Sequence, residues 1–225
     1  MQDEIVLYSY WRSTAAYRVR IALNLKGLGY RTQPVHLLRD GGQQHAEGYV
    51  ALNPQHLVPT VVDGQRVLTQ SLAIMEYLDE HYVEQGAPLL PRGTRERARV
   101  RALALAVACD IHPLANLRVL QFLQSEFDCA DEGKRGWIQH WIATGFDALE
   151  AMLASHPDTG AFCHDDDPGM ADACLVPQVY NAQRWGLALD EWPTIARIHH
   201  NCMVLDAFLR AAPEQQPDAP EPATA

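Results

Sequence analysis

The first part of the chain alternates between short apolar runs and patterns of helical period. The run Ile5 to Ser9 (IVLYS) is rich in β-forming residues and predicts a strand. After Ser13, apolar residues recur at the spacing of one helix face as far as Gly27, a residue type that commonly follows a helix. The pattern therefore predicts a strand, a tight turn and a helix.

A hairpin and a second helix follow. Residues 30–37 predict another strand, and the apolar runs on either side of Asp63-Gly64 predict a β-hairpin. Ser71 then stands where it can cap a helix whose apolar residues share one face. The order βαβ and then ββα predicts a mixed sheet with helices on its faces, which is typical of an α/β thioredoxin-like domain.

The pattern changes near residue 90. Residues 86–94 contain two prolines and two glycines and predict a linker, because these residues do not continue a helix. We therefore expect a thioredoxin-like domain over residues 1–85 and, from composition and period, an all-α domain over residues 95–212. Residues 213–225 hold four prolines and three acidic residues without a basic one, and they predict a flexible tail.

Composition and charge restrict the partners. A formal net charge of −10, with 18 Lys and Arg scattered along the chain, argues against nucleic acid. The apolar run 102–109 is bounded by Arg101 and Asp110, far short of what a membrane span needs, and the acidic start of the chain does not resemble a secretory signal. Five cysteines without a CxxC pair indicate thiols in a reducing compartment, so we expect a cytoplasmic protein.

Hydroxyl side chains stand at the start of both predicted helices of the first domain. Unpaired backbone N–H groups and the helix dipole favour an anion there, so Ser13 and Thr14 are placed to hold a thiolate. The simpler interpretation is that one of them only caps the helix. The pair Gln70-Ser71 suits a carboxylate in the same way, and Pro59 at a strand start indicates a turn or a cis peptide bond.

Ordered motifs across nearly the whole chain resemble one family. They are Ser13 to Leu23 (STAAYRVRIAL), Asp40 to Gln44 (DGGQQ), Ala51 to Pro54 (ALNP), Val58 to Thr60 (VPT), Gln70 to Ile74 (QSLAI), Leu114 to Leu120 (LANLRVL), Gly145 to Glu150 (GFDALE), Met170 to Asp172 (MAD) and Leu175 to Val179 (LVPQV). In this order they resemble the zeta class of glutathione transferases, which includes maleylacetoacetate isomerase and maleylpyruvate isomerase.

The resemblance implies the glutathione transferase fold, glutathione as cofactor and a homodimer. It also implies a set of glutathione-binding residues, with roles that depend on the part of the tripeptide they meet. They are Ser13, Thr14 and Ala15 around the sulfur, Val58 before a cis Pro59 at the cysteinyl part, Gln70 and Ser71 at the γ-glutamyl end, Gln44 at the glycyl side, and Asp110 and His112, the last two from the neighbouring subunit.

The implied activity is the cis–trans isomerisation of maleylacetoacetate to fumarylacetoacetate, a step of aromatic amino-acid catabolism. Ser13, Thr14 and Arg12 would serve catalysis, with the main thiolate donor of the two hydroxyls left open. The two carboxylates of the keto acid would be bound by Arg12, Arg118 and Arg184, with Asn116 as a polar neighbour. Maleylpyruvate isomerisation, thiol transfer to α-halo acids and a noncatalytic interaction role are the alternatives.

Two positions depart from the family pattern. Ala15 stands where relatives often carry a cysteine, which excludes a mechanism with a protein thiol at this place and favours the maleylpyruvate type. Gly169 stands at an expected helix N-cap where Thr or Ser is common, a small change because glycine caps only slightly less well. The run Cys163 to Asp167 lacks the spacing of a calcium loop, so we expect no metal.

Overall fold

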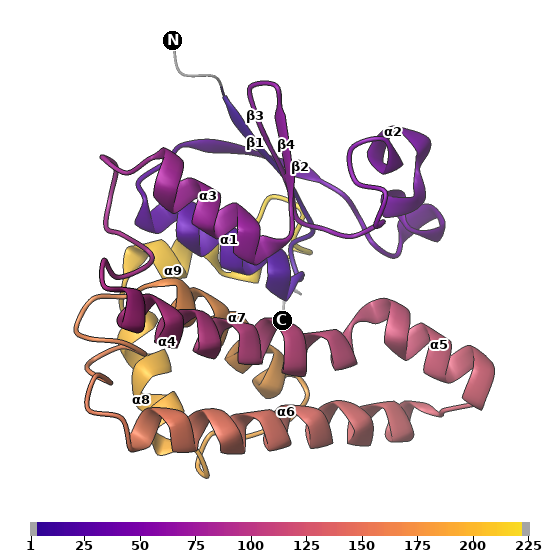
Figure 1. Ribbon diagram of the computed structural model, residues 1–225. Coiled ribbons are helices and arrows are strands. Elements are labelled where there is room, and N and C mark those ends of the chain that lie inside the picture. The colour runs from indigo at the N-terminus through magenta and orange to yellow at the C-terminus, as the bar shows by residue number, and fades with distance from the viewer. Residues whose placement is uncertain (1–3, 222–225) are drawn as a thin grey trace. The chain divides into compact units, whose positions relative to one another are not determined.

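The structure is a computed structural model that describes residues 4–221. The chain forms two compact units, which are described separately (Figure 1). Unit 1 contains the residues up to Leu89 together with those from Val204 onwards, and unit 2 contains Leu90–Met203. The N-terminal part of the chain is therefore completed by its C-terminal end.

Unit 1 is built on a four-stranded mixed sheet of order β2-β1-β3-β4. Strand β1 runs parallel to β2 and antiparallel to β3, and β3 and β4 form the predicted hairpin. The strands are β1 (Ile5–Ser9), β2 (Tyr30–Pro34), β3 (Thr60–Asp63) and β4 (Arg66–Thr69). This is the mixed sheet that the pattern predicts, with a second strand that ends earlier than residue 37.

Helices α1 (Thr14–Leu25) and α3 (Ser71–His81) lie side by side against the sheet (Figure 1). Between β2 and β3 the chain forms two 3₁₀ turns, η1 (Arg39–Gly41) and η2 (Gln43–His45), and the short helix α2 (Glu47–Val50). Leu7 and Val61 of the sheet and Ile21 and Ile74 of the helices are fully buried. These side chains form the core that joins helices to sheet.

Three basic side chains are also buried in unit 1, those of Arg18, Arg20 and Lys26. Lys26 is 1% exposed, and its ammonium lies 3.5 Å from the carboxylate of Asp79. The same carboxylate accepts a hydrogen bond of 2.7 Å from the amide of Leu89. Asp79 therefore ties the end of α1 to the segment that leaves unit 1, which the sequence predicts as a linker. That segment is not loose, because Leu89 and Leu90 are both buried.

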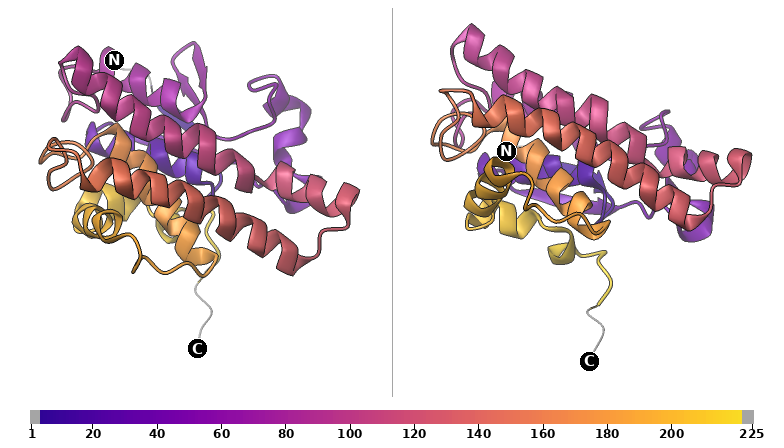
Figure 2. Two further views of the ribbon diagram at one scale, coloured as in Figure 1. Left: turned by 60° about the horizontal axis from the view of Figure 1, so that its bottom comes forward. Right: turned by 90° about the horizontal axis from the view of Figure 1, so that it is seen from below.

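Unit 2 is helical, as predicted. Its elements are α4 (Thr94–Leu105), the π-helical turn η3 (Ala106–Ile111), the 3₁₀ turn η4 (His112–Ala115), α5 (Leu117–Phe127), α6 (Asp131–Ala154), α7 (Met170–Arg184) and α8 (Pro193–Cys202). Helix α6 runs alongside the series from α4 to α5 in every view (Figures 1 and 2). The side chains of Ile142, Phe146 and Val179 are fully buried in this unit.

The helical series from α4 to α5 is interrupted by η3 and η4. Two local causes are visible: Pro113 cannot donate a helical hydrogen bond, and Gly145 of α6 packs so closely on Ile111 that a β-carbon there would clash. The interruption matters because η3, η4 and the start of α5 carry four of the predicted site residues, Asp110, His112, Asn116 and Arg118.

The prediction was wrong at the C-terminal end of the chain. Helix α9 (Asp206–Ala211), assigned above to the helical domain, packs on α1 and belongs to unit 1. The supposed flexible tail begins with a 3₁₀ turn, η5 (Pro213–Gln215), and Gln216 is buried. Proline content misled the prediction, because this segment is held by contacts with residues far away in sequence. Residues 222–225 lie outside the described range.

Candidate functional site

The register of the sheet brings three chain segments of unit 1 to one end. Tyr8 pairs with Thr60, and Thr60 pairs with Thr69 on its other side. The turn after β1, the segment before β3 and the start of α3 after β4 therefore meet at the same edge of the sheet. These segments carry all the predicted glutathione-binding residues of unit 1 except Gln44, which lies in η2.

The start of α1 is capped by Ser13. Its hydroxyl oxygen accepts a hydrogen bond of 3.2 Å from the amide of Ala16, so Ser13 is the N-cap. A hydroxyl that accepts one hydrogen bond still has its own proton to donate to an anion. Thr14, the next residue, is 8% exposed, and no acidic residue lies in the first helical turn. Both interpretations of Ser13, cap and anion donor, are therefore compatible.

The segment before β3 contains the cis peptide bond between Val58 and Pro59, one of the two possibilities that Pro59 indicated and the one the resemblance implied. Its position is fixed by side chains of the chain segment between β2 and β3. The hydroxyl of Tyr49 donates to the carbonyl of Leu57 at 2.6 Å, and the amide of Asn53 donates to the same carbonyl at 2.8 Å. The backbone at Val58, just before β3, is thereby held in place at this end of the sheet.

Helix α3 begins differently from the prediction. Gln70, not Ser71, occupies the N-cap position, with φ 69° and no side-chain cap bond, because Ser71 already has helical geometry. The hydroxyl of Ser71 instead accepts a hydrogen bond of 3.2 Å from the guanidinium of Arg18, which is 2% exposed. A buried positive charge thus lies behind a helix N-terminus, an arrangement that favours a carboxylate.

Gln44 supplies a further polar group on this unit. It is 7% exposed, and its amide nitrogen lies 3.1 Å from a ring nitrogen of His45 and 3.4 Å from the carbonyl of Leu37. Its amide oxygen is buried and has no hydrogen-bond partner among the described residues. A buried oxygen of this kind is costly unless a donor from outside the chain meets it, which is what a ligand amide or ammonium provides.

The remaining predicted residues lie in unit 2. Asp110 is exposed in the π-helical turn η3, and His112 begins η4. Asn116 is the N-cap of α5, and its side chain accepts a hydrogen bond of 3.2 Å from the amide of Arg118. The side chain predicted as a substrate neighbour therefore has a structural role at the helix start, while the Arg118 side chain is exposed.

Arginine side chains of the predicted carboxylate site lie against aromatic rings. Arg184 is the last residue of α7; its guanidinium lies 4.9 Å from the ring centroid of Trp185 and donates to Asn181 at 3.3 Å. In unit 1, the guanidinium of Arg12 lies 5.3 Å from the ring of Trp11. Such stacking orients a guanidinium.

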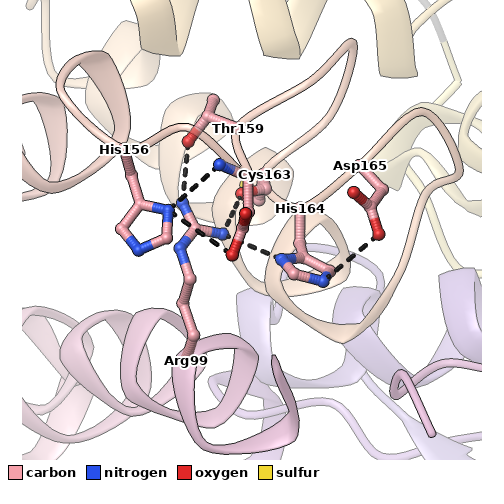
Figure 3. Close-up of polar contacts among 7 residues, drawn as sticks. Arg99, His156, Thr159, Cys163, His164 and Asp165 are labelled. Atoms are coloured by element: carbon pink, nitrogen blue, oxygen red, sulfur yellow. Dashed lines mark hydrogen bonds and ion pairs between the residues drawn. The ribbon is translucent and has the colours of Figure 1, made fainter. Parts of the chain in front are cut away.

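The acidic loop between α6 and α7 is a structural cluster (Figure 3). Arg99 of α4 donates to the carbonyl of Cys163 at 2.7 Å and to the hydroxyl of Thr159 at 2.7 Å, and it lies 3.2 Å from a ring nitrogen of His164. Burial raises the pKa of the Cys163 thiol well above its ordinary value, so this cysteine is no nucleophile. Among the described residues, no group of three or more His, Cys, Asp or Glu side chains has a metal-binding arrangement.

Sequence reasoning missed several polar groups next to the site. Arg18 and Arg20 are on the buried side of α1, and Asp218 lies near the end of the chain; all three contact the segments described above. The available signal was the presence of two arginines within the apolar helix TAAYRVRIALNL, where a charge requires a specific partner. No local signal pointed to Asp218, because its partner is 207 residues away.

Comparisons with known proteins show which proteins this chain is similar to. The model of the glutathione S-transferase N-terminal domain matches residues 12–81. Maleylacetoacetate isomerase of Rhizobium meliloti is 51% identical over 96% of this chain and 99% of its own length. The holo structure of maleylpyruvate isomerase, a bacterial glutathione S-transferase of the zeta class, has 45% identity and a TM-score of 0.92 over 96% of this chain and all of that one. Maleylacetoacetate isomerase from Methylobacterium extorquens AM1, with bound malonate and glutathione, has 43% identity and a TM-score of 0.91 over 96% of this chain and all of that one.

Proposed function

Because the chain belongs to the zeta class of glutathione transferases, the family of the maleylacetoacetate and maleylpyruvate isomerases, we propose that it isomerises a maleyl keto acid with glutathione as cofactor. The single observation that carries this proposal is the meeting of two helix N-termini, each with a hydroxyl, at one end of the sheet of unit 1. The N-terminus of α1 suits a thiolate, and the N-terminus of α3 suits a carboxylate.

The residues of unit 1 fit glutathione on structural grounds. The helix N-terminus at Ser71, with Arg18 behind it, matches the α-carboxylate of the γ-glutamyl group. The backbone at Val58 lies just before β3, where its N–H and C=O can pair with the backbone of a peptide, and the partnerless amide oxygen of Gln44 requires a donor. When bound, glutathione supplies a thiolate that adds to the cis double bond of the keto acid and departs after rotation about the resulting single bond.

Ser13 and Thr14 hold the thiolate form. A free thiol with a pKa of about 8.5 is only a few per cent ionised at neutral pH. One or two hydrogen bonds to a charged acceptor, at about 1.5 to 3 kcal/mol each, lower that pKa by about one to four units. Ser13 donates its hydroxyl proton while its oxygen caps α1, and the N-terminal dipole of α1 adds to the effect.

The arginines bind the dicarboxylate. The family resemblance assigns Arg12 of unit 1 and Arg118 and Arg184 of unit 2 to the two carboxylates of the keto acid. The residue type suits this role, since a guanidinium binds a carboxylate through two parallel N–H groups. Malonate bound to the Methylobacterium relative is itself a dicarboxylate and supports this chemistry. Positioned positive charge also stabilises the enolate that forms as the double bond opens.

The preferred substrate is maleylacetoacetate, with maleylpyruvate second. Relatives that carry either name match nearly the full length of the chain. The two keto acids share the maleyl group on which the thiolate acts, and they differ in chain length. Ala15 supports a mechanism in which the only reacting sulfur is that of glutathione, because the chain has no cysteine in its first hundred residues.

We also propose a cytoplasmic homodimer. The helical run Thr94–Phe127 is long and apolar enough, by length and composition alone, to cross a membrane, and only 22% of its most apolar window is buried. Leu105, Phe122 and Phe127 are 44%, 57% and 68% exposed. A second copy that covers this surface explains its apolar character. Sedimentation velocity tests it: a monomer at micromolar concentration would contradict the proposal.

The isomerase assay follows the ultraviolet absorbance of each keto acid with and without glutathione. We expect glutathione-dependent conversion of maleylacetoacetate, and conversion of maleylpyruvate at a lower kcat/KM. The product is identified by its trans geometry in proton magnetic resonance, which separates isomerisation from conjugation. Absence of a glutathione-dependent change with either keto acid would refute the proposed function.

A further inference from the structure

The C-terminal segment after α9 is folded back onto unit 1. The side-chain amide of Gln216 donates to the carbonyls of Arg210 and Ala212 at 3.0 and 2.9 Å, and Gln216 is 8% exposed. The amide of Ala219 donates to the carbonyl of Gln216 at 3.0 Å, which closes a turn. This turn holds Asp218 in a defined place at the surface of unit 1.

Asp218 contacts the turn that carries the predicted catalytic residues. Its carboxylate oxygen Oδ2 accepts a hydrogen bond of 2.9 Å from the amide of Trp11, a partner 207 residues away in sequence. Trp11 immediately precedes Arg12 and Ser13. The other oxygen, Oδ1, is buried and has no hydrogen-bond partner among the described residues. The carboxylate is therefore partly desolvated, and its hydrogen bond to the Trp11 amide is strong because the acceptor is ionised.

The carbonyl of Trp11 is held by the same end of the chain. Arg20, which is fully buried, donates to this carbonyl at 3.0 Å and to the carbonyl of Ala211 at 2.8 Å. A third donation, at 3.1 Å, reaches the hydroxyl of Ser9 at the end of β1. Both backbone polar groups of Trp11 are thus fixed by the C-terminal segment. Asp218 holds the amide directly, and Arg20 links the carbonyl to Ala211.

We propose that Asp218 is a positioning residue for the isomerase reaction, acting through the Trp11 amide to fix the orientation of Arg12 and Ser13. The inference rests on the proposed function. Asp218 holds the N–H of the peptide unit between Tyr10 and Trp11, and the carbonyl of the same unit accepts a hydrogen bond of 2.9 Å from the Ser13 amide. Loss of the Asp218 contact releases one side of this peptide unit, and Arg12 and Ser13 change direction with it. Misplacement of a reacting group by about 1 Å costs up to a hundredfold in rate.

An effect of charge alone is the competing explanation. Asp218 and Arg12 both act electrostatically on the ring of His36, so each charge is felt on this side of unit 1. Asp218→Asn separates the two effects, because its amide oxygen still accepts from the Trp11 amide while the charge is gone. Asp218→Ala removes both charge and acceptor. Glu221→Ala removes an acidic side chain three residues further on and serves as the control.

The test measures kcat, KM for each substrate, thermal unfolding and the pH titration of the thiolate absorbance of bound glutathione. We expect Asp218→Ala to lower kcat/KM between about tenfold and a hundredfold, and to raise the pKa of the bound thiol. Asp218→Asn should recover most of the activity, and Glu221→Ala should match the wild type. A chain that ends at Ala219 should be active, and a chain that ends at Pro217 should behave like Asp218→Ala.

Wild-type kcat/KM in Asp218→Ala would overturn the inference. Equal losses in Asp218→Asn and Asp218→Ala would also overturn it, since charge and not the hydrogen bond would then be responsible. A lowered melting temperature with unchanged thiolate titration would reduce Asp218 to a stabilising contact. If the wild type shows no isomerase activity, the proposed function fails by itself, and the thiolate titration of Asp218→Ala still tests the positioning of Ser13.

Discussion

Substitution of Ser13 tests the thiolate donor most directly, because the side chain has two roles that two variants can separate. Its oxygen caps α1 by accepting from the amide of Ala16 at 3.2 Å, and its proton is the one proposed to stabilise the sulfur. Ser13→Ala removes both roles. Ser13→Gly removes the hydroxyl but keeps a residue type that is tolerated at an N-cap.

The magnitudes of the two effects differ enough to be distinguished. Loss of the cap costs about 0.5 to 2 kcal/mol in Ser13→Ala and only a few tenths in Ser13→Gly. Loss of one hydrogen bond to the thiolate costs about 1.5 to 3 kcal/mol, which raises the pKa of the thiol by about one to two units. The two variants should therefore differ in stability and agree in the pKa of bound glutathione.

The assay combines urea unfolding with the pH dependence of thiolate absorbance in the glutathione complex. We expect Ser13→Ala to be clearly less stable than Ser13→Gly, and both to show the same raised thiol pKa and a lower kcat, with glutathione binding largely retained. Ser13→Thr is the control that keeps hydroxyl and cap. A wild-type thiol pKa in Ser13→Gly would refute the assignment of Ser13 as donor and leave Thr14 in that role.

Three further predictions concern other parts of the chain. Arg184→Ala should raise KM for the keto acid with little change in KM for glutathione, measured by steady-state kinetics; a change confined to glutathione would contradict the role given to Arg184. Asp79→Ala should lower the free energy of unfolding by about 3 to 5 kcal/mol in urea titration, because Lys26 would stay buried without its ion pair. A change below about 1 kcal/mol, which is typical of a surface ion pair, would show that Lys26 reaches water. Burial and the hydrogen bond to Asp63 raise the pKa of Tyr77 to about 12. The stability that this bond adds is complete below the ordinary tyrosine pKa of about 10 and is lost as pH rises through the folded value. Asp63→Asn should therefore move the tyrosinate absorbance of Tyr77 to lower pH, and an unchanged titration would contradict the assigned cause.

Local pattern was sufficient for most of the elements and for several site residues. The helix after Ser13, the hairpin around Asp63-Gly64 and the N-cap at Gly169 all follow from residues close together in sequence, because period, turn type and capping are local properties. The order of the motifs along the chain also identified the family. Where the local pattern was misread, as with Ser71 at the cap of α3, the error was one residue.

The roles within the site required more than local pattern. The family resemblance implies Asn116 as a neighbour of the substrate, and the structure shows that its side chain is the N-cap of α5. Ser71 accepts a hydrogen bond from Arg18, a partner that local pattern does not identify. The binding roles of Arg118 and Arg184 stay predictions. An arginine near a helix end occurs in many helices for structural reasons alone, so its presence does not identify a ligand-binding residue. The orphaned oxygen of Gln44 became visible only when its burial and its neighbours were known.

The sequence by itself determined the strands, the hairpin, the helices and the hydroxyls near two helix starts, since each depends on neighbours a few residues apart. The pairing of β1 with β2 and β3 joins residues far apart in the chain. Only the tertiary structure decided that the C-terminal segment belongs to unit 1 and that Asp218 holds the Trp11 amide. A proline-rich, acidic segment has too little apolar surface to order itself. It is ordered here because its polar groups meet partners such as Trp11, which folding brings within hydrogen-bond distance from the opposite end of the chain.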